Sequence, residues 1–226
     1  MNADLVHIAE SMRGEDAYQR YLHGLLAQNS AQCRASFEQW MDADPDLRSL
    51  YEDLVQRALY EVGDRWERGR ISVATEHAAT AISESLLNLT YPQLFAVPRI
   101  GKSAVVACVA NEYHQIGARM VADFFELHGW RGYFLGANTP LRDVIAFTKE
   151  KSPDVLVLSV SLAFNLAAVI SAAAEIRTQF PDIPILVGGQ AFRWGGRERL
   201  ERIAGVRCMT SLGDLERWIA SGDGHA

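Results

Sequence analysis

Cysteine, long apolar runs and excess positive charge are all scarce or missing in this chain of 226 residues. Its three cysteines, Cys33, Cys108 and Cys208, are far apart and have no second cysteine at metal-ligand spacing. Neither a disulfide framework nor a zinc site is therefore indicated. We expect all three cysteines to be small apolar side chains in the core.

No apolar run approaches the roughly 18 residues that a membrane-spanning helix needs. The first residues also lack the basic and then apolar segments of a secretory signal. The chain carries 28 acidic residues against 22 lysines and arginines, and this net charge of −6 disfavours a large phosphate-binding face. We expect a soluble, cytoplasmic protein that has neither a membrane nor a nucleic acid as a direct partner.

The first hundred residues show helical patterns and no convincing strand. Four helices are predicted, at residues 15–28, 31–42, 46–68 and 73–94. Apolar residues of the third recur at the three-four spacing of one buried helical face: Leu47, Leu50, Leu54, Ala58, Leu59, Val62 and Trp66. Gly69 should end this helix, and Ser72 should cap the next one. Four helices joined by short loops predict a four-helix bundle domain over residues 1–97.

From residue 98 onward, short apolar runs alternate with helix-length amphipathic segments. The predicted strands are 104–110, 132–135, 155–160, 183–187 and 206–209, and the predicted helices are 115–128, 141–151, 165–180 and a last one from 212. Apolar strands that alternate with helices indicate a parallel sheet covered on both faces. Residues 98–226 are therefore expected to form an α/β domain with a doubly wound, flavodoxin-like or Rossmann-like fold. Ligands of such sheets bind beyond the carboxyl ends of the strands.

The loop after the first strand combines an acid, a histidine and a glycine: Glu112, His114 and Gly117. Glu112 is close enough in sequence to accept a proton from one imidazole nitrogen while the other nitrogen binds a metal. A single imidazole is a poor site for a free ion, because zinc usually takes three or four protein ligands. The metal should therefore arrive already coordinated, inside a macrocycle.

Three short motifs at successive strand ends carry a family resemblance. They are Glu112-x-His114-x-x-Gly117, Ser159-x-Ser161 and Gly188-Gly189. In order and spacing they resemble the cobalamin-binding domain, whose signature is Asp-x-His-x-x-Gly, then Ser-x-Leu, then Gly-Gly. The chain departs from this signature at Glu112 and Ser161, where the family has Asp and Leu.

The resemblance implies that His114 is the lower ligand of cobalt, in place of the cofactor's own benzimidazole, and that Glu112 orients it. It also implies a slot for the freed nucleotide tail beside Ser159, Gly188 and Gly189. The residues that it assigns to cofactor binding in this domain are Glu112, Tyr113, His114, Gln115, Ile116, Gly117, Ser159, Ser161, Leu162, Gly188 and Gly189.

The predicted bundle carries a further motif, in which nine residues separate Trp66 from Glu76 and His77. It resembles the helical cap of cobalamin-dependent photoreceptors, a family that also tends to carry glutamate at the position of Glu112. The resemblance implies that these three residues pack around the upper alkyl group of adenosylcobalamin or methylcobalamin. It further implies a light sensor or regulator without catalytic residues, in which photolysis of the cobalt–carbon bond repacks the cap and changes oligomerisation or partner binding.

Gene regulators of that family carry a helix-turn-helix domain before the bundle, and the roughly fourteen residues before the first predicted helix leave no room for one. The output would then pass through a homo-oligomer or a partner regulatory protein.

Three alternatives stay open. A corrinoid methyl carrier of a methyltransferase system shares the bundle and the sheet domain, although a bulky Trp66 over the cofactor counts against it. A second chromophore, a bilin, would be lined by five residues of the bundle: His23, Trp40, Tyr51, Tyr60 and Tyr91. A flavodoxin-like module without cobalamin would be colourless.

Overall fold

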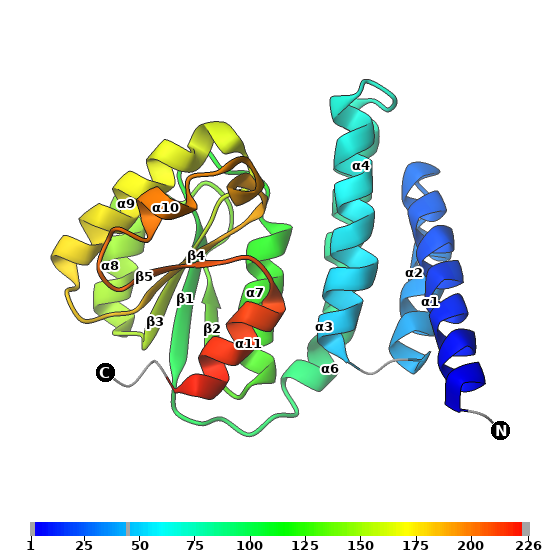
Figure 1. The fold of residues 1–226 in the computed structure, drawn as a ribbon, viewed down its shortest axis with the longest axis horizontal. Helices are drawn as coiled ribbons and strands as arrows, with labels where there is room; N and C mark the ends of the chain where they lie inside the picture. Colours follow the sequence, from blue (N-terminus) through cyan, green and yellow to red (C-terminus); the bar gives the residue numbers. More distant parts are fainter. Residues whose placement is uncertain (1–2, 44–45, 223–226) are drawn as a thin grey trace. The chain divides into compact units, whose positions relative to one another are not determined.

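The computed structural model describes residues 3–43 and 46–222, with side chains from Gly14 onward. The chain divides into two compact units, Met1–Pro92 and Gln93–Ala226, and each is described by itself (Figure 1). We predicted the domain boundary between residues 97 and 98, which is five residues after the division between these two units. None of the described helices is both long and apolar enough to cross a lipid bilayer.

The first unit is a bundle of helices. Its elements are α1 (Ala3–Leu26), α2 (Ser30–Ala43), a continuous run of α3 (Leu47–Ser49), η1 (Leu50–Gln56) and α4 (Arg57–Glu67), then α5 (Val73–Leu87), η2 (Asn88–Thr90) and α6 (Tyr91–Leu94), which crosses into the second unit. The four predicted helices are confirmed, with differences in detail. The third widens into a π-helix over the seven residues of η1, and the fourth ends as an α-helix at Leu87 rather than at residue 94.

Helix α1 begins at Ala3, so the start predicted at residue 15 is wrong. The helix continues through Gly14, where glycine costs only about 1 kcal/mol relative to alanine. A Cβ at Gly14 would lie 3.6 Å from the ring of Trp40 in α2, an ordinary contact distance. One glycine therefore does not end the helix at this position.

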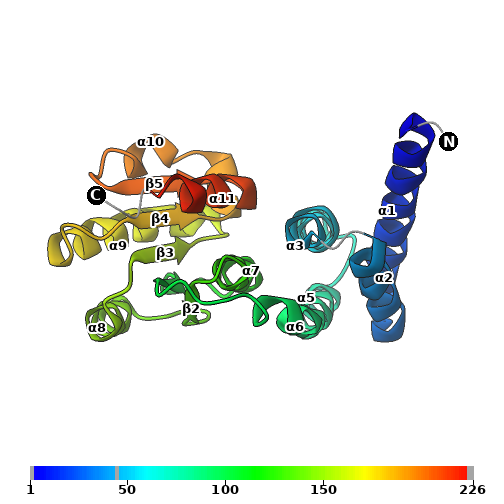
Figure 2. The same cartoon turned by 90° about the horizontal axis from the view of Figure 1, so that it is seen from below.

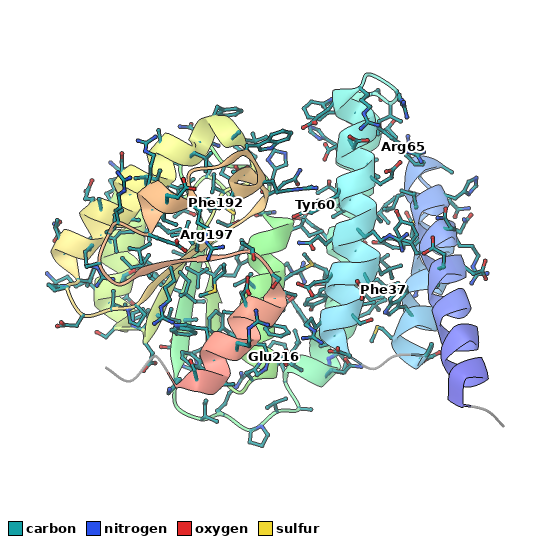
Figure 3. All side chains as sticks on the ribbon, in the orientation of Figure 1. Phe37, Tyr60, Arg65, Phe192, Arg197 and Glu216 are labelled. Atoms are coloured by element: carbon teal, nitrogen blue, oxygen red, sulfur yellow. The ribbon has the colours of Figure 1, made fainter. Side chains whose placement is uncertain are left out.

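Buried aromatic side chains fix the helices of this unit to one another. Phe37 of α2 is fully buried within the bundle (Figure 3). The buried hydroxyl of Tyr21 in α1 donates to Ser83 Oγ of α5 at 2.9 Å. The hydroxyl of Tyr51 in η1 lies 3.1 Å from Thr90 Oγ1 of η2. Because an unpaired buried hydroxyl would cost about 1–3 kcal/mol, these pairs favour a single arrangement of the bundle.

The second unit is a parallel sheet between two layers of helices. Its strands are β1 (Ser103–Cys108), β2 (Arg131–Phe134), β3 (Val155–Ser159), β4 (Ile185–Gly188) and β5 (Val206–Met209), in the order β2-β1-β3-β4-β5. Its other elements are α7 (Ile116–Leu127), α8 (Leu141–Lys151), η3 (Ala163–Asn165), α9 (Leu166–Gln179), η4 (Gln190–Trp194), α10 (Arg197–Leu200) and α11 (Leu212–Ser221). Figure 2 shows α8 and α9 on one face of the sheet and α7 and α11 on the other. The predicted doubly wound α/β fold is confirmed.

The strand register places the ends of three strands at one level. Cys108 of β1 pairs with Ser159 of β3, and Ser159 pairs with Gly188 of β4. The loops after β1, β3 and β4 therefore leave the sheet side by side. Since β2 and β3 flank β1 on opposite sides, the chain reverses its winding there, and this switch point is where such sheets bind ligands.

The three cysteines are buried and free, as predicted. Burial raises the pKa of the thiols of Cys33 and Cys208 to about 11. Burial, with the nearby charge of Glu112, raises the pKa of Cys108 to about 12. All three are therefore neutral thiols that pack as small apolar groups.

Candidate functional site

A buried carboxylate organises the loop after β1. The side chain of Glu112 has 0% exposure, and Oε1 accepts from the backbone N–H of His114 at 3.0 Å and from its Nδ1 at 2.6 Å. Oε2 accepts from the backbone N–H groups of Ser161 at 2.8 Å and Leu162 at 3.0 Å, and from Asn165 Nδ2 at 3.3 Å. The structure thus brings together four of the predicted site residues. Because residue 161 donates through its backbone, serine in place of leucine keeps this bond.

These hydrogen bonds decide the charge of Glu112. Burial alone would raise its pKa, but the side-chain and backbone bonds from His114 and the backbone bonds from Leu162 and Ser161 lower the pKa to about 2. The carboxylate is therefore ionised at neutral pH and holds a proton on Nδ1 of His114. In that tautomer Nε2 is the basic nitrogen of the ring. The His114 side chain is 43% exposed.

Three asparagines that the sequence analysis did not single out tie this loop to its neighbours. Asn111 has a left-handed backbone, with φ of 64°, and its N–H donates to Asn138 Oδ1 at 2.7 Å. Asn138 follows β2, also has a positive φ of 48°, and donates its own N–H to the carbonyl of Glu112 at 2.8 Å. Asn165 Nδ2 donates to the carbonyl of Asn111 at 3.2 Å. Asparagine tolerates a positive φ better than most residues. This preference is the one sequence signal that could have drawn attention to Asn111 and Asn138.

Tyr113 and Gln115 lie on either side of His114 in the same loop. Tyr113 is 67% exposed, and its hydroxyl accepts from Asn138 Nδ2 at 3.2 Å. Gln115 Oε1 accepts from the backbone N–H of Ala137 at 3.1 Å. Both side chains are therefore held against the loop after β2.

Ile116 and Gly117 form the half-buried first turn of α7. A Cβ at Gly117 would meet nothing within 4 Å, so the protein's own packing does not require glycine there. Among the described residues, no group of three or more potential ligand side chains could hold a free metal ion. One imidazole oriented by a carboxylate instead suits a metal that brings its other ligands with it. These residues fit a corrinoid.

The glycine pair after β4 is explained in part by the fold itself. Gly189 has φ of 120°, and a Cβ there would lie 2.1 Å from the carbonyl oxygen of Val160. A Cβ at Gly188 would lie 3.0 Å from the carbonyl oxygen of Met209. Ser159, paired with Gly188 across the sheet, is 8% exposed. Close packing of the turn against Val160, just after β3, therefore requires glycine at 189, and the approach of β5 leaves little room for a side chain at 188.

The three residues predicted to cover the cofactor, Trp66, Glu76 and His77, all lie at one end of the helical unit. Gly69 ends α4 with a positive φ of 66° and donates its N–H to the carbonyl of Trp66 at 2.8 Å, and Ser72 caps α5, as predicted. Trp66 is 40% exposed. In the first turn of α5, Glu76 Oε2 accepts from His77 Nδ1 at 2.6 Å. The unit thus presents an indole and a carboxylate-bound imidazole at the α4–α5 turn.

Two of the five residues considered for a second chromophore have structural roles within the bundle. Tyr51 is fully buried beside Thr90. Trp40 Nε1 donates to Ser49 Oγ at 3.0 Å. Core packing and helix contacts therefore account for both.

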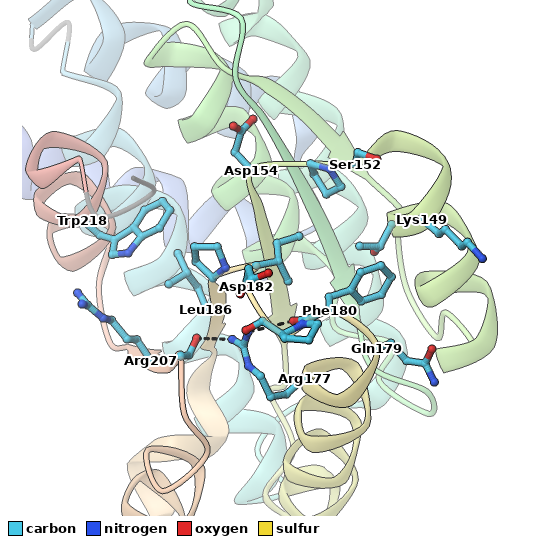
Figure 4. A pocket seen from close by; sticks show the side chains of 16 residues that line it. Lys149, Ser152, Asp154, Arg177, Gln179, Phe180, Asp182, Leu186, Arg207 and Trp218 are labelled. Atoms are coloured by element: carbon cyan, nitrogen blue, oxygen red, sulfur yellow. Dashed lines mark hydrogen bonds between the residues drawn. The ribbon is translucent and has the colours of Figure 1, made fainter. Parts of the chain in front are cut away.

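A pocket of about 680 Å³ lies at the opposite edge of the sheet (Figure 4). Its lining includes Asp154, Pro184 and Gly205, which immediately precede β3, β4 and β5. The guanidinium of Arg177 in this pocket donates to the carbonyls of Pro181 at 2.6 Å and Gly205 at 2.8 Å. This cation therefore holds loops of the fold together, away from the residues around His114.

Two family models match the chain, and both are described as the B12 binding domain. One matches residues 102–211, which contain β1 to β5, and the other matches residues 17–90 of the helical unit. The chain is 31% identical over 134 residues to the HTH-type transcriptional repressor CarA of Myxococcus xanthus. The aligned region covers 59% of this chain and 45% of that protein. It is 27% identical over 177 residues to the HTH-type transcriptional repressor CarH of the same organism, and the aligned region covers 72% of this chain and 58% of that protein.

The chain thus spans about half the length of these curated relatives. Among solved structures, the monomethylamine corrinoid protein of Methanosarcina barkeri shares the fold, with a TM-score of 0.76, 15% identity and coverage of 92% of this chain and 98% of that one. With one B12 binding domain model matched on each of its two units, this chain belongs to the family of B12 binding domain proteins.

Proposed function

We propose that this chain is a cobalamin-dependent light sensor or regulator rather than an enzyme. The observation that carries the proposal is the pair formed by Glu112 and His114, in which a buried, ionised carboxylate holds Nδ1 of a half-exposed imidazole. We assign Nε2 of His114 as the lower ligand of cobalt. Glu112 orients the ring and keeps it in the required tautomer.

The other residues of the second unit bind the cofactor from the same edge of the sheet. The loop residues Tyr113, Gln115, Ile116 and Gly117 contact it beside His114. The strand-end residues Ser159, Ser161, Leu162, Gly188 and Gly189 contact its nucleotide tail. This assignment is supported by the paired register of Ser159 and Gly188 and by the bonds that tie residues 161 and 162 to Glu112.

In this proposal, the side chains at the α4–α5 turn of the helical unit distinguish a sensor from a methyl carrier. When bound, an alkylcobalamin supplies a cobalt–carbon bond that visible light cleaves. We assign Trp66, Glu76 and His77 to the upper alkyl group, adenosyl or methyl. The response of the chain itself is a repacking of Trp66 and the α4–α5 turn, which changes self-association or the binding of a partner regulatory protein. The similarity to two proteins named transcriptional repressors supports a regulatory output.

A corrinoid methyl carrier is the second candidate. The observation in its favour is the fold shared with the monomethylamine corrinoid protein over 92% of this chain. A carrier must expose the upper alkyl group to a partner methyltransferase. An indole at Trp66 that packs against this group would hinder such transfer, so the two functions predict opposite effects of removing it.

The test is to reconstitute the purified chain in the dark with adenosylcobalamin or methylcobalamin and to record its absorbance and its elution volume before and after green light. The same measurements are made on His114→Ala and Trp66→Ala. A sensor takes up the cofactor, changes its spectrum and size on illumination, and loses the size change but keeps the uptake in Trp66→Ala. The carrier would be established instead by an elution volume that does not change on illumination, together with methyl transfer to a thiol acceptor that becomes faster in Trp66→Ala. An absorbance band of a linear tetrapyrrole in protein from cells that make one would add a bilin.

A further inference from the structure

We propose that Asn165 is a positioning residue of the cofactor site, which fixes the carboxylate of Glu112 and through it the imidazole plane of His114. The proposal rests on the proposed function, because it assigns a role in the same site. It concerns a residue outside the three sequence motifs that identify that site.

The position of Asn165 makes its side-chain contacts informative. Asn165 stands at the N-cap of α9, where asparagine is among the preferred residues because its side chain can accept a bond from the helix backbone. Here the side chain makes no capping bond. It is 5% exposed and turns instead toward the loop after β1, so capping does not explain it.

Both hydrogens of the Asn165 amide have partners in that loop. Nδ2 donates to the carbonyl of Asn111 at 3.2 Å and to Glu112 Oε2 at 3.3 Å. An amide NH2 has two hydrogens to donate, so this geometry uses both. Asn165 therefore holds the backbone before Glu112 and the carboxylate of Glu112 at the same time.

The remaining donors to Glu112 show what this contact adds. Oε2 also accepts from the backbone of Ser161 and Leu162, which belong to the same loop as Asn165. Oε1 accepts twice from His114. Asn165 thus adds a side-chain donor to Oε2, the carboxylate oxygen that His114 does not contact in these bonds. Removing it leaves Oε2 with only the two backbone donors and cuts the tie between Glu112 and the loop after β3 that Asn165 makes through its side chain, so the acceptor of His114 Nδ1 is held less firmly.

The test uses two substitutions and one control on the full chain. Asn165→Ala removes the amide, and Asn165→Asp keeps its size and its preference for the helix start but places a carboxylate against Glu112. Ser211→Ala removes a side chain that does cap its helix, by accepting from the N–H of Asp214 at 3.0 Å. It controls for the loss of a helix cap in the same unit.

Two readouts are measured. In the protein without cofactor, nitrogen chemical shifts of labelled histidine, assigned with His114→Ala, report which ring nitrogen of His114 carries the proton at neutral pH. With methylcobinamide, which lacks the nucleotide base, the absorbance change on binding reports an axial nitrogen that only the protein can supply. Residues that orient a metal-binding histidine typically contribute about 10–100-fold to metal affinity.

We expect wild type and Ser211→Ala to hold the proton on Nδ1 and to bind methylcobinamide alike. Asn165→Asp and Asn165→Ala should show a mixed tautomer and bind it at least about tenfold more weakly. If both Asn165 variants are folded and match wild type in both readouts, the positioning role is refuted. If Asn165→Ala melts early, Asn165→Asp decides alone. If wild type binds no methylcobinamide through nitrogen while the tautomer still shifts in the variants, the proposed function fails and the role of Asn165 stands.

Discussion

Replacing Glu112 by glutamine removes the charge at the centre of the loop network. The pKa of about 2 in the folded protein lies roughly 2.5 units below the ordinary value of 4.5. Each unit corresponds to about 1.4 kcal/mol, so the ionised carboxylate stabilises the fold by about 3 kcal/mol at neutral pH. A glutamine amide would also turn a donor toward N–H groups that need an acceptor. We expect Glu112→Gln to lower the free energy of unfolding by about 3 kcal/mol at pH 7.

This loss should depend on pH in one direction. A carboxyl group with a depressed pKa in the folded state contributes its full stability above the unfolded pKa, here 4.5, and loses it as the pH falls through about 2. At pH 3 only about 1 kcal/mol of the contribution remains. The difference between wild type and Glu112→Gln should therefore shrink from about 3 kcal/mol at pH 7 to about 1 kcal/mol at pH 3.

The assay is urea denaturation of both proteins between these pH values. Unfolding is monitored by circular dichroism and by tryptophan fluorescence, so that the transition of each unit can be assigned. Glu198→Gln, at an exposed position of α10, is the matched control and should change stability by less than about 0.5 kcal/mol without a pH trend. A difference for Glu112→Gln below about 1 kcal/mol at pH 7, or one that stays constant down to pH 3, would refute the reasoning.

Three further outcomes are expected. Gly189→Ala should lower the free energy of unfolding by more than about 3 kcal/mol, because its Cβ would lie 2.1 Å from the Val160 oxygen at a φ of 120°. The control Gly195→Ala, with a φ of 105° and nothing within 4 Å of its Cβ, should lower it by about 1–2 kcal/mol in the same urea titration. The three thiols, each with a pKa raised by burial to about 11 or 12, should react with a thiol reagent only after unfolding, as mass spectrometry of labelled protein would reveal; rapid labelling of native protein would contradict their burial. Ser72→Ala removes the acceptor for the Thr75 N–H at 3.1 Å and should cost about 1 kcal/mol by thermal melting, so an unchanged melting temperature would show that the cap contributes nothing.

The fold was largely predictable because its main signals are local. The continuous apolar runs of β1 and β3 indicated strands buried on both faces, and both form central strands of the parallel sheet. Gly69 and Ser72 marked the α4–α5 turn correctly. The start of α1 was misplaced because the helix continues through Gly14, a residue whose low helix propensity disfavours but does not forbid a helix.

The site was predictable only where its residues share a short motif. Glu112 and His114 are two positions apart, so their pairing could be inferred from sequence. Asn165 contacts Glu112 from 53 positions away, and the sequence placed it only at the start of the predicted helix 165–180. Gly189 was interpreted as leaving room for a ligand, whereas the approach of Val160 is a contact that only the folded sheet creates. Contacts between distant loops are set by topology, and no spacing rule reports them.

The reach of Glu112 across to the loop after β3 also constrains how this protein can be re-engineered. An aspartate at position 112 would end about 1.5 Å, one carbon–carbon bond, short of the amides of Ser161 and Leu162. Those two backbone groups would have to move inward for the shorter acid to meet them. A grafted segment 111–117 from a relative with the shorter acid should therefore work only when segment 161–165 is transplanted with it.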